Sequence, residues 1–175
     1  MSGPPSYDDV VAFHGHDCPG LAVGYRVALV ARERLRIERA PDEEIVAVVE
    51  NLSCAVDAIQ VVLGCTVGKG NLILRDWGKH VYTIHNRATG EGLRISVERP
   101  ADWRELSRDE VRRALLEAPP EQFLKLGSAP GPLPEKARVE PSEPCAECGE
   151  GTMASRLVEV GGRRVCVPCA ECDHA

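Results

Sequence analysis

Apolar residues in the first third of the chain recur at the spacing of helices. Residues 21–37 are apolar along one side and end in a basic stretch, and Pro19 suits the first position of that helix. Ser6, followed three residues later by Asp9, has the pattern of a capping box and indicates a shorter helix at the start. The sequence therefore predicts two consecutive helices before the first strand.

Segments rich in β-branched residues predict a sheet after these helices. Residues 44–51 (EIVAVVEN) form the clearest strand, and further strands are expected at residues 71–74, 80–87 and 93–98. The last two flank residues 88–92, where glycines suit the positive φ of a hairpin turn. This part of the sheet is therefore expected to be antiparallel.

Two more helices are indicated by their first residues. Ser53 can cap a helix that Gly64 then stops. Ser107 with Glu110 forms a second capping box, which opens a helix further along the chain. Because helices are interleaved with a mostly antiparallel sheet, the predicted fold class is α+β.

A proline-rich stretch divides the chain. Residues 127–144 carry prolines at positions 130, 132, 134, 141 and 144, so this stretch cannot keep a helix and has little apolar surface to bury. We therefore expect an α+β core at residues 1–126, a semi-extended linker at residues 127–144 and a small domain at residues 145–175.

Composition and charge narrow the function. The 175 residues carry a net charge of −6 and only two Trp, three Tyr and two Phe, which argues against nucleic acid as a primary partner. No apolar run reaches the roughly 20 residues of a membrane helix, and residues 1–10 lack the basic and apolar regions of a signal peptide. We therefore expect a cytoplasmic protein without a membrane partner. In that compartment the 8 cysteines are expected to be metal ligands or reactive thiols.

The cysteines near the end of the chain have the spacing of a zinc site. Two CxxC pairs, separated by seventeen residues, are formed by Cys145, Cys148, Cys166 and Cys169. A segment as short as residues 145–175 is too small to fold around a core without a metal or another cross-link. The pattern predicts a structural zinc finger, in which Cys172 or His174 is an alternative for one ligand.

The densest polar motif is residues 13–20 (FHGHDCPG). His14, His16 and Cys18 alternate, so an extended backbone would point all three to one side, where two or three of them can hold a metal. Cys18 and Cys54 each stand at the expected start of a helix, whose dipole lowers the pKa of a thiol. His16, Cys18 and Cys54 are therefore candidate ligands of a core metal and, with the thiols as nucleophiles, candidate catalytic residues.

Three further residues belong to the candidate site. Asp57, one turn after Cys54, can accept a hydrogen bond from a histidine ligand or act as a proton acceptor, which makes it a candidate catalytic residue. Lys69 lies in a glycine-rich turn that can bind an anion, although a plain loop is the commoner meaning of such a turn. Cys65 is a weaker candidate, because taken alone it is better explained as a small buried thiol.

These motifs together resemble a known family. The segments FHGHDCPGLAVGYR, NLSCAVDAIQVVLGCTVGKGNL, DWGKH and IHNR are similar to the FmdE family, which is named for a component of formylmethanofuran dehydrogenase, and the likeness covers most of residues 8–98. The cysteine-rich tail resembles the treble-clef zinc finger that many members carry.

The resemblance implies an α+β core, homodimers and a cysteine-lined cleft. Carried over by position, the cleft residues here are His16, Cys18, Cys54, Asp57 and Cys65, with Lys69 nearby. In the dehydrogenase that gives the family its name, a molybdopterin metal centre on other subunits performs the reaction. The resemblance therefore makes this chain a candidate subunit or accessory of such an oxidoreductase.

The leading hypothesis is a metal-binding protein with a redox or metal-handling role in one-carbon or molybdenum/tungsten metabolism. It would hold structural zinc in the finger and a second metal in the core. The alternative is a non-enzymatic adaptor or regulatory subunit, whose finger docks on a partner such as a larger oxidoreductase complex. A small-molecule sensor that uses the core cleft is a third hypothesis. A core-bound metal would favour chemistry at the site over the adaptor.

Overall fold

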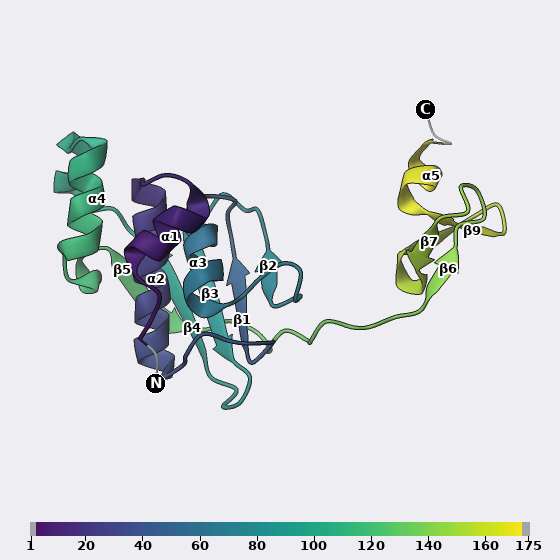
Figure 1. Ribbon diagram of the computed structural model, residues 1–175, viewed down its shortest axis with the longest axis horizontal. Helices are drawn as coiled ribbons and strands as arrows, with labels where there is room; N and C mark the ends of the chain where they lie inside the picture. Colours follow the sequence, from purple (N-terminus) through teal and green to yellow (C-terminus); the bar gives the residue numbers. More distant parts are fainter. Residues whose placement is uncertain (1–2, 173–175) are drawn as a thin grey trace. The chain divides into compact units, whose positions relative to one another are not determined.

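The computed structural model describes residues 3–172, and the chain divides into two units, the first ending at Ala137 and the second beginning at Arg138 (Figure 1). We call them the core unit and the finger unit. The helices of the core unit are α1 (Tyr7–His14), α2 (Pro19–Leu35), α3 (Ala55–Leu63) and α4 (Arg108–Glu117), with the short 3-10 helices η1 (Ala101–Glu105) and η2 (Pro120–Gln122). Its strands are β1 (Ile45–Val49), β2 (Leu72–Leu74), β3 (Val81–Asn86), β4 (Gly92–Val97) and β5 (Leu124–Ser128). No helix among the described residues is long and apolar enough to cross a membrane.

The five strands form one sheet in the order β2-β1-β3-β4-β5. Only β1 and β2 run parallel, and the other three pairs are antiparallel. This confirms the α+β class with a mostly antiparallel sheet. The parallel pair is joined through α3, which therefore starts at one end of β1 and returns the chain to β2.

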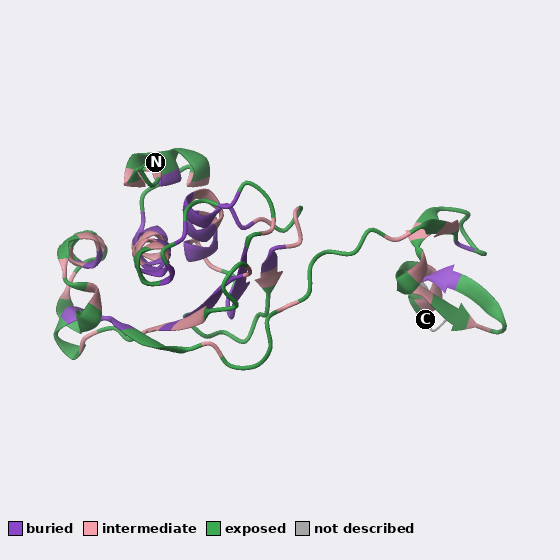
Figure 2. Ribbon diagram, turned by 90° about the horizontal axis from the view of Figure 1, so that it is seen from below, coloured by how far each residue is buried: buried purple, intermediate pink, exposed green. Residues whose placement is uncertain are grey.

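The helices cover one face of the sheet. Helices α2 and α3 pack side by side against it, α1 contacts both of them, and α4 lies beside α2 (Figures 1 and 2). Alternate residues of the central strands, among them Ala47 and Ile84, belong to the main apolar core with these helices. The residues between them form the opposite face, which carries the polar side chains of Thr83, His85 and Arg94 beside Val46 and Val48. On this polar face Arg94 makes a bidentate ion pair with the buried Glu50.

The helix starts follow the sequence in three places and differ in one. Ser6 and Ser107 both make the predicted capping boxes, and Cys18 caps α2 ahead of Pro19. The sequence predicts Ser53 as the N-cap of α3, but the residue at that position is Cys54. The Ser53 hydroxyl instead donates to the Asn51 side chain at 2.5 Å, a local bond that competes with helix capping.

The segment expected as a linker is partly built into both units. Strand β5 continues to Ser128, inside the stretch that the sequence predicts to be linker. Its backbone pairs with β4, and this pairing does not require apolar side chains on β5. Residues 129–137 then lie against the polar face of the sheet, where Arg87 donates to the carbonyl oxygens of Pro134 and Glu135 at 2.6 and 3.0 Å. These hydrogen bonds hold a stretch that has little apolar surface of its own.

The close approach of α2 and α3 depends on Gly24. A Cβ atom at this position would lie 2.1 Å from the Ala55 carbonyl oxygen and 2.6 Å from the Ala55 Cα. We expect Gly24→Ala to lower the free energy of unfolding by about 3 kcal/mol, because one helix must move away from the other. Chemical denaturation would measure this loss. Gly68→Ala is the matched control, since a Cβ there meets nothing within 4 Å, and an equal loss in both variants would contradict the explanation.

The finger unit consists of two small hairpins and a helix. Strands β6 (Ser142–Pro144) and β7 (Gly151–Met153) form one hairpin, and β8 (Leu157–Val160) and β9 (Arg163–Cys166) form the other after η3 (Ala154–Arg156). Helix α5 (Val167–Cys172) follows directly. The second hairpin turns at two glycines with positive φ, as predicted from Gly161 and Gly162. Among the described residues of this unit, the buried cluster contains only Cys145, Val165 and Cys166, with a few partly buried neighbours.

Candidate metal centres

The two CxxC pairs of the finger unit come together. Potential ligand sulfurs lie within 4.8 Å of one another on Cys145, Cys148, Cys166 and Cys169. The first pair lies in the turn between β6 and β7, where Gly149 has a φ of 75°, and the second lies at the end of β9 and in α5. Four thiolates in this arrangement fit tetrahedral zinc. Cys172 is the last residue of α5, and His174 lies outside the described residues.

Backbone N–H groups of the finger donate hydrogen bonds to the sulfur of Cys145 and favour its thiolate form. The Cys145 Sγ accepts hydrogen bonds from the N–H groups of Cys166 at 3.2 Å and Glu147 at 3.4 Å. Hydrogen bonds from backbone N–H groups, with that of Cys166 the largest cause, lower the pKa of Cys145 to about 6. The pKa of Cys169 is raised, first by its hydrogen bond to Cys166. Thiols gathered in this way lose their protons when a structural zinc ion binds them.

A second cluster of metal-ligating side chains lies in the core unit. It contains His14, His16, Cys18 and Cys54, whose potential ligand atoms also lie within 4.8 Å of one another. The end of α1, the loop after it and the starts of α2 and α3 supply these residues. Two imidazoles and two thiols form a donor set that zinc accepts in tetrahedral sites.

The path of the chain through the core cluster differs from the predicted extended segment. His14 is the last residue of α1, and Gly15 ends the helix in a left-handed conformation with a φ of 93°. The chain then turns through His16 and becomes extended only at Cys18, where φ is −156°. The side chains of His14, His16 and Cys18 are therefore brought together by a helix end and a tight turn. The alternation of side chains along an extended strand, which the sequence predicts, is not what gathers them.

His14 is held with one ring nitrogen directed away from the cluster. Its Nδ1 lies 2.7 Å from Asp57 Oδ2, and Asp57 Oδ1 accepts a hydrogen bond from Gln60 Nε2 at 3.0 Å. The His14 Nε2 is buried and has no hydrogen-bond partner among the residues that the structure describes. A buried nitrogen without a partner costs free energy, and a metal bound there would remove the cost. Ligating histidines commonly give their other nitrogen to a carboxylate in this way.

The two core thiols differ in their surroundings. Cys18 is buried, and its Sγ accepts a hydrogen bond from the Leu21 N–H at 3.4 Å, as expected of a helix cap. Cys54 makes no side-chain cap bond. Burial, followed by the hydrogen bond to Cys18, raises the pKa of Cys54, so the lowered pKa predicted from its helix start is wrong for this residue.

His16 is the most exposed member of the core cluster. Its ring packs on that of His14 with the centroids 4.4 Å apart, and it makes no hydrogen bond within the described part of the chain. Three of the candidate ligands are therefore less exposed, and the fourth, His16, is held only by ring contact. Such a site resembles catalytic zinc sites, in which three protein ligands leave one exchangeable position.

The other predicted site residues divide into one that joins the cluster and two that do not. Asp57 supports His14, as described above. Cys65 lies beyond the opposite end of α3, fully buried, with its Sγ 3.6 Å from the Ile45 carbonyl oxygen, and burial raises its pKa to about 12. The Lys69 ammonium donates to the carbonyl oxygens of Ala40 and Asp42, both at 3.1 Å, and is therefore used to hold that loop.

Two contributors to the core cluster were less evident from sequence. His14 is one of three alternating candidates, and its buried Nε2 without a partner among the described residues makes it as good a candidate ligand as the other members of the cluster. Gln60 was not predicted. Its position three residues after Asp57 on the same helix is the signal that could have indicated the contact.

Comparisons with known proteins agree with this architecture. The family model described as "FmdE, Molybdenum formylmethanofuran dehydrogenase operon" matches residues 13–128, more than half of the chain. The chain belongs to the FmdE family. The model of the prokaryotic dksA/traR C4-type zinc finger matches residues 140–171, which confirms the predicted finger.

Two individual proteins extend the comparison. The crystal structure of a tungsten formylmethanofuran dehydrogenase FmdE-like protein from Syntrophus aciditrophicus is 25% identical and has a TM-score of 0.73, with 97% of each chain covered. A protein from Archaeoglobus fulgidus named "Probable S-adenosyl-L-methionine-binding protein" is 31% identical over 93% of this chain. This FmdE-family chain covers 52% of that relative, about half its length.

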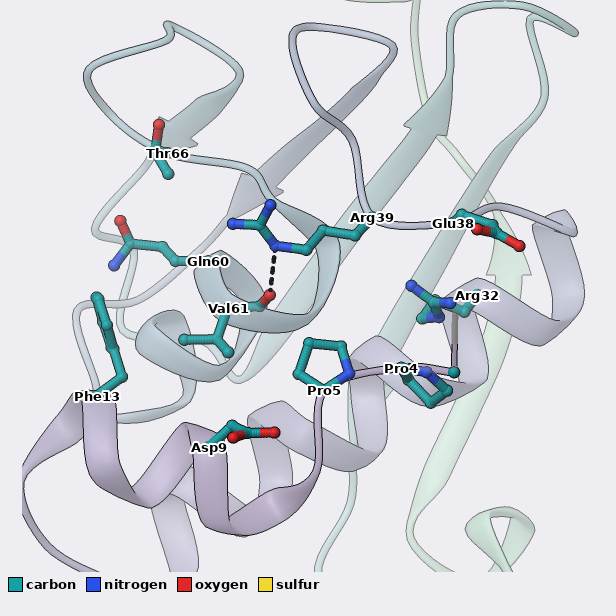
Figure 3. A pocket seen from close by; sticks show the side chains of 11 residues that line it. Pro4, Pro5, Asp9, Phe13, Arg32, Glu38, Arg39, Gln60, Val61 and Thr66 are labelled. Atoms are coloured by element: carbon teal, nitrogen blue, oxygen red, sulfur yellow. Dashed lines mark hydrogen bonds between the residues drawn. The ribbon is translucent and has the colours of Figure 1, made fainter. Parts of the chain in front are cut away.

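A groove lies between α1, α2 and α3 of this FmdE-family chain (Figure 3). It has a volume of about 680 Å³ and is lined by residues that include Pro5, Phe13, Arg32, Arg39 and Gln60. The Arg39 Nε donates to the Val61 carbonyl oxygen at 3.0 Å, which fixes its guanidinium in the groove (Figure 3). Through Gln60 the groove reaches Asp57, and through Asp57 it reaches His14.

We expect Asp57→Asn to weaken binding of a metal in the core by about 10- to 100-fold. The amide keeps the shape of the carboxylate but loses the charge that holds His14 with Nε2 free for the metal. Competition with a chromogenic chelator would measure the affinity. Asp102→Asn, an exposed carboxylate on η1, is the matched control, and equal affinities for the two variants would contradict this role.

Proposed function

We propose that this FmdE-family protein binds a transition metal, for which zinc fits best, in its core. The ligands would be His14 Nε2, His16, Cys18 and Cys54. The observation that carries the proposal is the buried His14 Nε2, which lacks a partner among the described residues and shares a cluster with two thiols, while Asp57 holds the other nitrogen. The metal would act as a Lewis acid when bound, and the chain would position it and control access to it.

The exposed fourth ligand supports a metal-handling or redox role. His16 can leave without disturbing the three less exposed candidate ligands, which would open a coordination position for a substrate or for an acceptor of the metal. A two-electron oxidant such as a peroxide would also convert the two neighbouring thiolates into a disulfide while it is reduced to water, and the metal would then lose two ligands. Membership of a family described by the molybdenum formylmethanofuran dehydrogenase operon supports a place in one-carbon or molybdenum/tungsten metabolism.

Metal content of the full-length protein tests the proposal. We expect two metals per chain, and one in Cys148→Ser, whose finger has lost a ligand. His16→Ala should keep its core metal but release it to a chelator faster, since an exposed ligand is gone. A single metal in the unmodified protein that disappears in Cys148→Ser would refute the core site. That result would favour the alternative function, an adaptor whose finger docks on a partner.

A second candidate function is S-adenosylmethionine binding in the groove of Figure 3. The groove carries charges of both signs, with Arg32 and Arg39 near Asp9 and Glu38, and it offers Phe13, which is 60% exposed, as an apolar contact. S-adenosylmethionine has a carboxylate, cationic groups and an aromatic base, so such a lining suits it. The name of the Archaeoglobus fulgidus relative favours the same ligand.

Calorimetry with S-adenosylmethionine tests this second function. Arg39→Gln should weaken binding by about tenfold, because it removes one charge-assisted contact. Arg34→Gln, an exposed position on α2 outside the groove, should bind as the unmodified protein does. Absence of any heat of binding would reject the ligand.

A further inference from the structure

An apolar pocket lies on another side of the metal-ligating cluster. It has a volume of about 280 Å³ and lies between the start of α2, the end of β4, η1 and α4. Its walls are mostly apolar and include Val23, Val97, Trp103, Val111 and Phe123. Several of these side chains are otherwise buried, and the Trp103 and Phe123 rings pack with their centroids 5.7 Å apart. A cavity with walls this well ordered is preformed, as ligand pockets usually are.

The pocket shares one residue with the core cluster. Gly20 lines the pocket, and a Cβ placed on it would lie 3.9 Å from the sulfurs of both Cys18 and Cys54. The same Cβ would lie 3.3 Å from the Cys54 Cβ. Glycine at this position therefore leaves the wall between the pocket and the two sulfurs one residue thick. A molecule in the pocket would lie beside the metal ligands.

The pocket lining carries a cationic group and, among the described residues, no acidic one. Arg99 and His80 are the titratable residues of its lining, and there is no carboxylate among the described residues that line it. The Arg99 Nη2 donates to the Trp103 carbonyl oxygen at 2.6 Å, which fixes the guanidinium and leaves its other N–H groups for a ligand. The adjacent carboxylate of Glu98 is paired with Lys125 at 2.5 Å and does not need Arg99. A fixed guanidinium above apolar walls suits a carboxylate with an apolar body.

We propose that this pocket binds a small monocarboxylic acid, with its carboxylate on Arg99 and its apolar body between α2 and α4. Since Gly20 separates the pocket from Cys18 and Cys54, the bound acid would lie beside the core metal. The pocket would then select the substrate of that centre. This link to a metal rests on the proposed function, whereas binding of the acid rests on the pocket alone.

The test uses 3-phenylpropionate as the probe and its neutral alcohol, 3-phenylpropanol, as the matched compound. Calorimetry or NMR titration of the full-length protein should show saturable binding of the acid with a Kd of about 1 mM or lower. The alcohol should bind about tenfold more weakly, because it lacks the charge-assisted contact to Arg99. No saturation with the acid, or equal affinity for acid and alcohol, would overturn the proposal.

Two variants locate the binding site independently. Arg99→Gln should lower affinity for the acid by about tenfold, whereas Arg113→Gln, an exposed charge on α4, should not change it. Val111→Phe should fill the pocket and abolish binding of both compounds, and its melting curve would show whether the fold is kept. Binding that survives both Arg99→Gln and a folded Val111→Phe would overturn the proposal.

Cobalt in place of the native metal tests the link to the core cluster. The visible spectrum of the Cys148→Ser protein, which reports the core site alone, should change when the acid saturates the pocket. A spectrum unaffected by bound acid would overturn the link. If the core binds no cobalt at all, the proposed function is wrong. Binding of the acid in the pocket is then still tested by the calorimetric measurement, which does not depend on a metal.

Discussion

Cys166→Ser is expected to unfold the finger unit and to leave the core unit folded. The finger unit has a buried cluster of only Cys145, Val165 and Cys166 among its described residues, which is far too small to offset the conformational entropy of the unit. Binding of structural zinc contributes about 10–16 kcal/mol in small fingers and is then the main source of stability. Losing one of four thiolates removes most of it.

The measurement is a pair of two-dimensional NMR spectra with metal content determined on the same samples. Signals from the finger unit should collapse to positions typical of unfolded chain, and one zinc per chain should be lost, while signals from the core unit stay dispersed. Cys172→Ser is the control, because it removes a cysteine outside the two CxxC pairs. If Cys172→Ser loses zinc and Cys166→Ser retains it, the ligand assignment is wrong.

The finger was predictable from sequence because its geometry is local. Each CxxC pair places two sulfurs on one turn, and Gly161 with Gly162 defines the hairpin between the pairs. The strands and most helix caps of the core were predictable for the same reason, since capping boxes and β-branched runs act over a few residues. Strand β5 was not predicted, because pairing with β4 decides it more than its own side chains do.

The core site was predictable only in part because tertiary contacts decide it. Cys54, Cys65 and Lys69 lie close together in the sequence, yet α3 separates Cys54 from Cys65, and Lys69 is taken up by backbone carbonyls. The thiol of Cys54 stands at a helix start, as expected, but burial and then the hydrogen bond to Cys18 raise its pKa. Neither the orientation of His14 nor the support from Gln60 can be derived from spacing along the chain.

Cys54→Ser is expected to abolish metal binding in the core and to make the stability of the core independent of zinc. In the unmodified protein, zinc at 100 times its Kd would raise the free energy of unfolding by about 2.7 kcal/mol, which corresponds to roughly 10 °C in Tm for a domain of this size. The serine variant should melt at the same temperature with and without zinc. Its fold should persist, because α2 and α3 pack through a core that does not need the metal.

Cys65→Ala is the matched comparison, since it removes a buried thiol on the opposite end of α3. It should lower Tm through the small cavity that it creates, but zinc should still raise Tm as in the unmodified protein. Cys148→Ser provides the background for both variants, so that zinc bound to the finger does not contribute to the shift. If zinc does not change the Tm of the unmodified core in this background, the proposed metal binding by His14, Cys18 and Cys54 is contradicted. The exposed His16 would then be a surface residue and not an exchangeable ligand.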